Sequence, residues 1–307
     1  MTVICIITVL VSLITEIDGS VTSTYLVTIP MMLPLYKKLK IDPKVLLLLC
    51  SATMCALFVT PWNGRTLRAA TLLEGIESPQ NYIFMKMLPM MLIYIALCIV
   101  LAVILARIQI KKGAGKVSAD VDTQTMMQAY FVFAVGLIVA LSVNYPDLKL
   151  QGSLLKKYSQ EMYSTACAVF LSGVVVGVLS ESGMMDAMVD FLIRIIPGTM
   201  GPWVYLIIAL FSTPLMLIFT NDIWQYALVP IVAGVSSKFG IPNEIVVLTL
   251  LMNMGAMISP VAQPQIYLAC DLADGTELAD YVKFSFVPLW ILSVLWVVIG
   301  YCIGVFR

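Results

Sequence analysis

Acidic and hydroxyl side chains gather at two places in the chain, each flanked by apolar segments. The second place contains Asn221 and Asp222. The first place contains Glu16, followed by Asp18, Gly19, Ser20, Thr22, Ser23 and Thr24. Carboxylate and hydroxyl oxygens are ligands that hard cations prefer, and a carboxylate can also carry a proton. We therefore expect a cation or proton site at each place, with Asp18 and Asp222 as candidate metal ligands. The alternative for each acid is a cap at a helix start.

Two arginines follow a proline in the sequence TPWNGRTLR, residues 60–68. A guanidinium presents a planar fork of donors that matches a carboxylate, so both arginines are candidates to hold an organic anion. The alternative for Arg68 is that its long side chain reaches toward the membrane interface. The predicted substrate-binding residues at this break are Asn63, Gly64, Arg65, Thr66 and Arg68.

A second proline-containing stretch, SPVAQPQ at residues 259–265, carries only neutral polar side chains. Proline frees backbone groups within a helix, and lipid offers these groups no hydrogen bonds. Both breaks must therefore face protein or a wet cavity. Ser259, Gln263 and Gln265 are expected either to hydrogen-bond a substrate or to satisfy the broken backbone.

The composition places these residues in a membrane protein. Of 307 residues, 61% are hydrophobic and 12% are charged, whereas roughly a quarter of an ordinary soluble domain is charged. Several stretches without any charged side chain have the length of about 20 residues that a helix needs to cross a bilayer. The lipid bilayer is thus an expected partner, and we expect a multi-pass protein of the cell inner (plasma) membrane.

Charge and residue types exclude several function classes. Eighteen acidic residues balance eighteen basic ones, and no basic stripe of the kind that binds phosphates is present, so nucleic acid is not an expected partner. The chain has no histidine, which excludes Ser/His and Cys/His nucleophile pairs and histidine-ligated zinc. We expect no enzyme and no cofactor; an intramembrane enzyme is kept only as an alternative from another class.

The apolar segments predict an all-α polytopic membrane protein with two repeats, each with a re-entrant helical hairpin and a broken transmembrane helix. The first repeat covers 1–107, with a hairpin at 2–38, a broken helix at 43–75 and a span at 84–107. A cytoplasmic linker is expected at 108–126. The second repeat covers 127–307, with spans at 127–146 and 161–180, a hairpin at 202–239, a broken helix at 243–272 and a span at 282–306.

Landmark residues recur in the two repeats at a spacing close to 200 residues. The pairs are Pro30 with Pro230, Lys38 with Lys238, Ile41 with Ile241, and Pro61 with Pro260. Lysine and arginine clusters at 37–44 and 107–116 favour a cytoplasmic location for both clusters. Counting spans from there opens both hairpins toward the cytoplasm, whereas inverted repeats open on opposite faces. Whether the repeats are inverted or parallel therefore stays open.

At these residues the chain resembles the citrate/metal/proton symporter (CitMHS) family of the ion transporter superfamily. The stretches that carry the resemblance are IDGSVTSTYLVTIPMMLPLYKKL at 17–39, TPWNGRTLRA at 60–69, LSESGMMDAM at 179–188, residues 222–230, and SPVAQPQIYLACDLADG at 259–275. They extend over nearly the whole chain. The resemblance implies a fold with two hairpins and two broken helices, and uptake of citrate, usually as a divalent-metal complex, coupled to protons.

Three departures from the family pattern bear on the expected substrate. Ser20 and Val21 replace a second Asp-Gly pair, which removes one carboxylate. Arg65 replaces a proline and adds positive charge, and the end of the second break loses hydroxyls at 263–265. We expect a symporter of citrate or a related di- or tricarboxylate, coupled to protons, with co-transport of Mg²⁺ or Ca²⁺ in a complex left open.

Family members carry further helices before the first hairpin, whereas this chain begins almost at the hairpin arm. The alternative function is therefore a truncated, non-transporting fragment of such a transporter. The expected small-molecule partner is a carboxylate, and a homodimer is left open.

Overall fold

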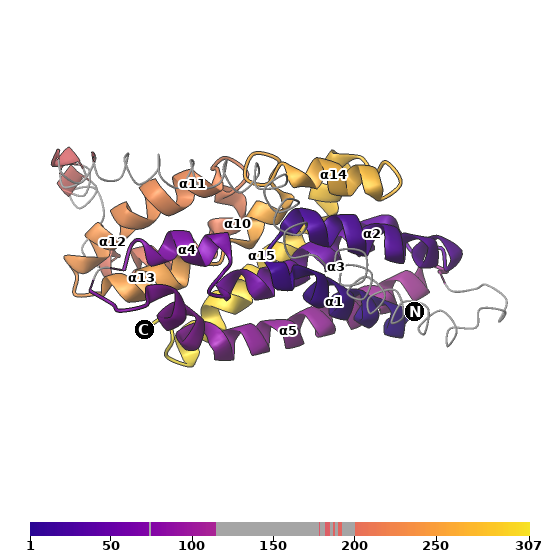
Figure 1. The fold of residues 1–307 in the computed structure, drawn as a ribbon, viewed down its shortest axis with the longest axis horizontal. Helices are drawn as coiled ribbons and strands as arrows, with labels where there is room; N and C mark the ends of the chain where they lie inside the picture. Colours follow the sequence, from indigo (N-terminus) through magenta and orange to yellow (C-terminus); the bar gives the residue numbers. More distant parts are fainter. Residues whose placement is uncertain (74, 115–177, 179–181, 185–186, 188–189, 192–199) are drawn as a thin grey trace, which may run out of the picture. The chain divides into compact units, whose positions relative to one another are not determined.

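The computed structural model describes residues 1–73, 75–114, 178, 182–184, 187, 190–191 and 200–307, and all structural statements refer to these. The two ranges 1–115 and 178–307 form one compact unit. Throughout the described part the regular elements are helical (Figure 1). The predicted spans at 127–146 and 161–180, most of the predicted linker and most of the LSESGMMDAM stretch lie outside the described residues, apart from single positions.

The chain begins with a pair of helices, α1 (Thr2–Thr15) and α2 (Val21–Lys38), which pack on one another. A 3-10 turn, Glu16–Asp18, joins them, and Gly19 follows with φ of +76°, a left-handed conformation that glycine adopts without steric cost. Ser20 then caps α2 by accepting a hydrogen bond from the backbone N–H of Ser23. The two helices lie where the sequence predicts the arms of the first hairpin.

A broken helix comes next and forms the centre of the unit. It consists of α3 (Pro43–Met54), a 3-10 turn (Cys55–Val59) and α4 (Gly64–Ala70), with residues 60–63 outside any helix. Asp42 caps α3 with Pro43 in its first turn, and Asn63 caps α4, which explains why each segment begins where it does. Every side chain in 45–59 except Leu57 is buried, because α3 packs on α1, α2, α5 and α15.

Two long apolar helices, α5 (Pro79–Lys111) and α15 (Leu278–Cys302), complete the candidate membrane spans. Together with Pro43–Ala70 they give three segments in the described residues that are long and apolar enough to cross a bilayer. α5 extends past both ends of the predicted span at 84–107, because charged side chains that end an apolar window do not end a helix. α15 ends at Cys302 and thus four residues before the predicted end at 306.

The second helix pair is less regular than the first. A 3-10 turn (Gly201–Trp203), α9 (Val204–Leu210) and α10 (Ser212–Leu215) form one arm. The other arm consists of α11 (Asn221–Ile223), a π-helical turn (Trp224–Leu228) and α12 (Val229–Ser237). Thr220 caps α11 by accepting from the backbone N–H of Ile223 at 3.2 Å. Both arms lie within the predicted hairpin range of 202–239, apart from Gly201.

The second broken helix has two interruptions where the sequence predicts one. α13 (Asn243–Leu250) ends before a short non-helical segment, 251–253, which is extended at Asn253, and a 3-10 turn (Met254–Ile258) follows. The predicted break at 259–264 separates this turn from α14 (Gln265–Leu272). The turn approaches α10 so closely that a Cβ on Gly255 would lie 2.5 Å from the backbone of Thr213. Only glycine permits this contact, which holds the non-helical segment in place.

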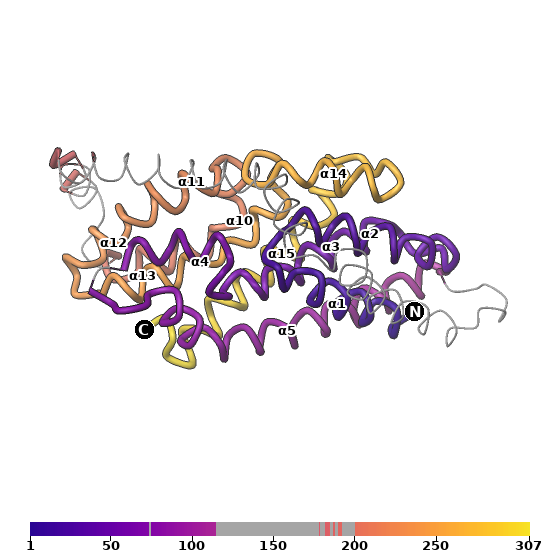
Figure 2. The backbone as a smooth tube through the Cα atoms, viewed as in Figure 1, coloured from indigo at the N-terminus to yellow at the C-terminus, as the bar shows by residue number. Residues whose placement is uncertain are grey.

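The ends of α2 and α12 share a local geometry at the 200-residue spacing. The backbone N–H of Ile41 donates to Tyr36 at 2.8 Å, and that of Ile241 donates to Ser236 at 3.1 Å. The preceding residues, Lys40 and Gly240, both have positive φ, of 53° and 82°. In the backbone trace, α4 lies beside the orange segment that contains α11, α12 and α13 (Figure 2). Residues from the two halves of the sequence therefore meet around α4.

Candidate functional site

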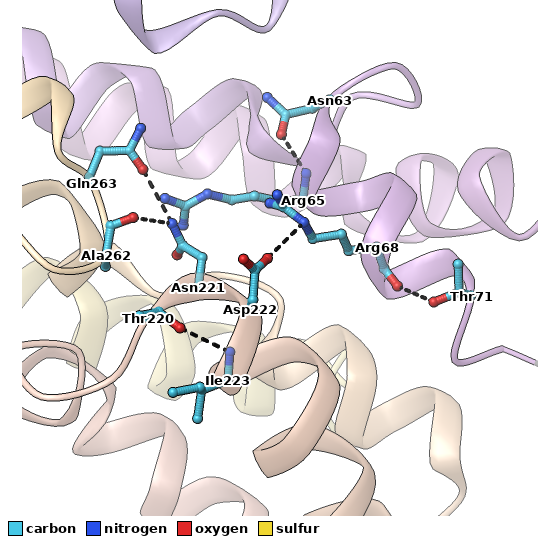
Figure 3. A network of polar contacts seen from close by, with 10 residues as sticks. All are labelled: Asn63, Arg65, Arg68, Thr71, Thr220, Asn221, Asp222, Ile223, Ala262 and Gln263. Atoms are coloured by element: carbon cyan, nitrogen blue, oxygen red, sulfur yellow. Dashed lines mark hydrogen bonds and ion pairs between the residues drawn. The ribbon is translucent and has the colours of Figure 1, made fainter. Parts of the chain in front are cut away.

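Polar side chains from three segments converge beside α4 (Figure 3). Arg65 and Arg68 extend from α4 toward the start of α11, where Asn221 and Asp222 lie. Gln263 comes from the second break. Arg65 and Arg68 are three residues apart on α4 and therefore lie on one face, and both contact residues of the range 200–307.

Arg68 and Asp222 form an ion pair between the described ranges 1–114 and 200–307, which are called the first and the second half below. Nε of Arg68 lies 3.4 Å from Oδ1 of Asp222, and the side chains are 16% and 47% exposed. The contact does not meet the geometry of a hydrogen bond, since both atoms are buried without a hydrogen-bond partner. A pair of this kind is loosely held, so the guanidinium can exchange this carboxylate for another. Arg68 and Asp222, predicted for substrate and cation sites respectively, thus lie in one place.

Arg65 is buried more deeply than Arg68, and among the described residues no acid lies within ion-pair distance of it. Its exposed fraction is 7%, and Nη1 donates to Oδ1 of Asn253 at 2.7 Å. The guanidinium carbon lies 3.8 Å from the centroid of the Phe58 ring. Asn63 holds the start of α4 by accepting from the backbone N–H of Arg65 at 3.0 Å. Arg65 is therefore a positive charge fixed inside the protein by neutral groups.

Each interhelical turn contacts the break of its own half. In the first half, Nε1 of Trp62 donates to the backbone oxygen of Ile17 at 2.7 Å. In the second half, Nδ2 of Asn221 donates to the backbone oxygen of Ala262 at 2.7 Å and lies 3.3 Å from Oε1 of Gln263. In the first half the break thus satisfies a backbone oxygen of the turn, and in the second half Asn221 satisfies a backbone oxygen of the break.

The two acids of the first turn differ in burial. Asp18 is exposed, and its oxygens accept from the backbone N–H of Ser20 at 2.8 Å and from the hydroxyl of Ser23 at 2.7 Å. Asp18 therefore braces the turn before α2, whose N-cap is Ser20. Glu16 is fully buried; one of its oxygens accepts from the hydroxyl of Thr24 at 2.8 Å, and the other has no partner in the described structure.

Sequence reasoning named Asp18 and gave no role to Glu16, although a signal was present. Cys5, Thr8, Ser12 and Glu16 recur at spacings of three or four residues, and all four are buried on the inner face of α1 and the turn that follows it. Helical periodicity therefore places Glu16 on the interior side, while Asp18 falls outside this stripe.

The remaining predicted site residues divide into two groups. Two of them hydrogen-bond the main chain: the hydroxyl of Thr66 donates to the backbone oxygen of Phe58 at 2.7 Å, and Oγ of Ser259 accepts from the backbone N–H of Ala262 at 3.1 Å. Gly64 is the first residue of α4. For Ser259 this is the second of the two roles expected from the sequence. Gln265 differs, because its Oε1 is buried without a partner in the described residues. Gly19 shapes the first turn, and Thr22 is half-buried in the first turn of α2.

Asn253 is a site residue that the sequence analysis missed. It lies in a charge-free stretch and is the first strongly polar side chain after Thr249. That isolation is the signal that was available, because a lone amide in an apolar helix needs a partner. Among the described residues, no three Cys, Asp or Glu side chains gather in a way that would hold a metal ion. The metal-ligand roles predicted for Asp18 and Asp222 stay predictions.

Comparisons with known proteins give the following relatives, all from Bacillus subtilis (strain 168). A citrate transporter is 30% identical over 301 residues, which cover 88% of this chain and 69% of the relative. The uncharacterized transporter YraO is 28% identical over 315 residues, covering 89% and 71%. A Mg²⁺/citrate complex secondary transporter is 25% identical over 312 residues, covering 91% and 71%. No family model and no solved structure matches the chain.

Proposed function

The chain belongs to the citrate/metal/proton symporter family, and from this membership we propose that it is a secondary active transporter of citrate or a related di- or tricarboxylate. The relatives are transporters and not enzymes. The three candidate spans in the described residues agree with a multi-pass membrane protein, which we place in the cell inner membrane.

The observation that carries this proposal is the meeting of two arginines with neutral amides beside α4. Arg65 and Arg68 supply two guanidinium groups, and Asn221 and Gln263 supply carboxamides from the opposite half. A polycarboxylate needs several donors, and in the described residues no acid lies within ion-pair distance of Arg65. The arrangement therefore favours a ligand with at least two carboxylates.

We further propose that the described unit contains two repeats with re-entrant hairpins. Support comes from Ser20 and Thr220, each of which caps the helix after its turn, and from the shared geometry at Ile41 and Ile241. Transporters of this build place the substrate between the repeats and move one part against the other around the site. Differential binding of the substrate to the two states would drive the change.

Coupling to protons is assigned in this proposal to a carboxyl group of the first turn. The buried and half-satisfied carboxyl of Glu16 is favoured over the exposed carboxylate of Asp18, since a buried carboxylate is costly unless it is protonated or paired. In the second half, Asp222 is the acid that would approach the cation of a metal–citrate complex. Co-transport of a proton through Glu16, or of a metal cation that approaches Asp222, would reduce the net charge that crosses the membrane with the substrate.

The test is uptake of radiolabelled citrate into proteoliposomes that contain the purified protein. Uptake is measured with and without a pH gradient, and with Mg²⁺, Ca²⁺ or neither. The proposal expects accumulation that depends on the pH gradient and is competed by unlabelled di- and tricarboxylates. Absence of uptake together with absence of citrate binding would favour the alternative, a non-transporting fragment.

A further inference from the structure

Arg65 is a buried cation whose hydrogen bonds and close contacts are all with uncharged groups. Nη1 donates to Oδ1 of Asn253 at 2.7 Å and lies 3.4 Å from the backbone oxygen of the same residue. Nη2 lies 4.0 Å from the sulfur of Met257, and the Phe58 ring covers the guanidinium at 3.8 Å. In the described part of the chain, no carboxylate lies within ion-pair distance of Arg65.

This arrangement is the reverse of what stability alone favours. A buried charge is costly unless an opposite charge pairs with it, and neutral acceptors or a ring face offset only part of that cost. Arg68 is more exposed, yet it is the arginine that has an acid, Asp222 at 3.4 Å. Glu16 attracts Arg65 from beyond ion-pair distance, and Arg68 repels it. A bound anion is the group that would complete the pairing of Arg65.

The neutral acceptor is held rigidly. Asn253 is 1% exposed and lies in the non-helical segment after α13, with φ of −116° and ψ of 90°. The close contact between Gly255 and Thr213 fixes the turn that follows. Because the main chain sets the position of the carboxamide, the orientation of the guanidinium is fixed before a ligand arrives, which lowers the entropic cost of binding.

We propose that Asn253 is a positioning residue that determines substrate specificity: its neutral carboxamide orients Arg65 without cancelling its charge, which stays available for a carboxylate of the substrate. This inference rests on the proposed function, since the ligand is taken to be a di- or tricarboxylate. An aspartate at the same position would accept the same hydrogen bond but would supply the counter-charge from the protein itself. Charge, and not shape, is therefore the property that the experiment changes.

The experiment is the substitution Asn253→Asp, because the two side chains have nearly the same size. The melting temperature of the purified protein should be retained, since the buried guanidinium gains a counter-charge. The Kd for citrate, measured by isothermal titration calorimetry, should rise by at least about tenfold. In proteoliposomes the KM for citrate should rise while the rate at saturating citrate changes little. A residue with a structural role only would not separate stability from affinity in this way.

Asn81→Asp is the matched control. It introduces the same exchange at an exposed residue in the first turn of α5 and should leave both the melting temperature and the Kd unchanged. Asn253→Ala is the second variant; it leaves Arg65 charged but without its acceptor, and it should weaken citrate binding by about tenfold.

Three outcomes would count against the inference. Wild-type affinity for citrate in Asn253→Asp would overturn it, and so would a clear fall in the melting temperature of that variant, because pairing would then not stabilise Arg65. If the wild-type protein bound no di- or tricarboxylate, the proposed function would fail first and this inference with it. The wild-type measurement therefore distinguishes the two failures.

Discussion

The turn at 16–20 and the turn at 216–220, each taken with the first residues of the helix that follows it, join helices in the same way but contribute different charges. Each ends in a hydroxyl residue that caps the following helix, and each contacts the break of its own half. The first turn keeps one acid buried, Glu16, without any basic partner at ion-pair distance among the described residues. The second turn pairs its acid, Asp222, with an arginine that belongs to the first half.

This difference indicates a division of roles between the halves. The first half supplies both cations, on α4, and a buried acid, whereas the second half supplies neutral amides and an exchangeable acid. A site with unequal contributions fits a substrate with several negative charges that is accompanied by a cation. Substitutions that change the charged groups of one half and not of the other test this division of roles.

The largest effect is expected from Arg68→Ala. Removing a guanidinium from a charge pair with a substrate carboxylate should weaken citrate binding on the order of a hundredfold. Calorimetric titration of purified protein measures the change. Arg107→Ala, at an exposed position of α5, serves as control and should bind citrate like the wild type. Unchanged affinity in Arg68→Ala would remove Arg68 from the site.

A second pair of substitutions tests which acid of the first turn, Glu16 or Asp18, couples transport to protons. Glu16→Gln should abolish accumulation driven by a pH gradient, a loss of about tenfold per pH unit for each coupled proton. Asp18→Asn should retain most of this accumulation, because the amide oxygen of asparagine can still accept from the backbone N–H of Ser20. The measurement is citrate uptake into proteoliposomes with imposed gradients. The opposite ranking of the two variants would return the coupling role to Asp18.

Asp222→Asn tests the exchangeable acid. Without its carboxylate, Arg68 loses a competitor for the substrate, so free citrate should bind about two- to fivefold more tightly. The advantage of the Mg²⁺ complex over free citrate should shrink in the same titrations. Asp274→Asn is a matched control, since it removes an exposed acid that pairs with Lys37 at 2.6 Å. Equal effects of both substitutions would show that the change is one of overall charge.

The smallest effect concerns the contact between the first turn and its break. Trp62→Phe removes the donor to Ile17 and should lower the free energy of unfolding by about 1 kcal/mol or less, because the indole is exposed. Chemical denaturation in detergent measures this. Trp203→Phe is the control, because that indole is also exposed and its N–H makes no hydrogen bond within the described residues. A larger loss in Trp203→Phe would contradict the role given to Trp62.

Local residue types in the sequence anticipate the first break of the described structure. Pro61 and Gly64 lie in a long apolar run, and the helix is interrupted at 60–63 as such residues require. The turn before Asn221 was likewise predictable from polar residues between apolar arms. These features depend on local chemistry, which a single sequence contains.

Contacts between distant segments were not predictable in the same way. The interruption at 251–253 has no proline, and its cause is the packing of Gly255 on α10, a tertiary contact. The ion pair of Arg68 with Asp222 joins residues that the sequence assigned to separate sites. The neutral environment of Arg65 also comes from a residue 188 positions away, Asn253.

The central claim is that the arginines of α4 and the amides of the second half bind one polycarboxylate between them. A structure of the protein with citrate bound, determined by electron cryomicroscopy in lipid nanodiscs, tests it most directly. Ligand density should lie against the guanidinium groups of Arg65 and Arg68 and within reach of Asn221. Density for citrate elsewhere in the protein, with Arg65 still contacted only by neutral groups, would contradict the claim.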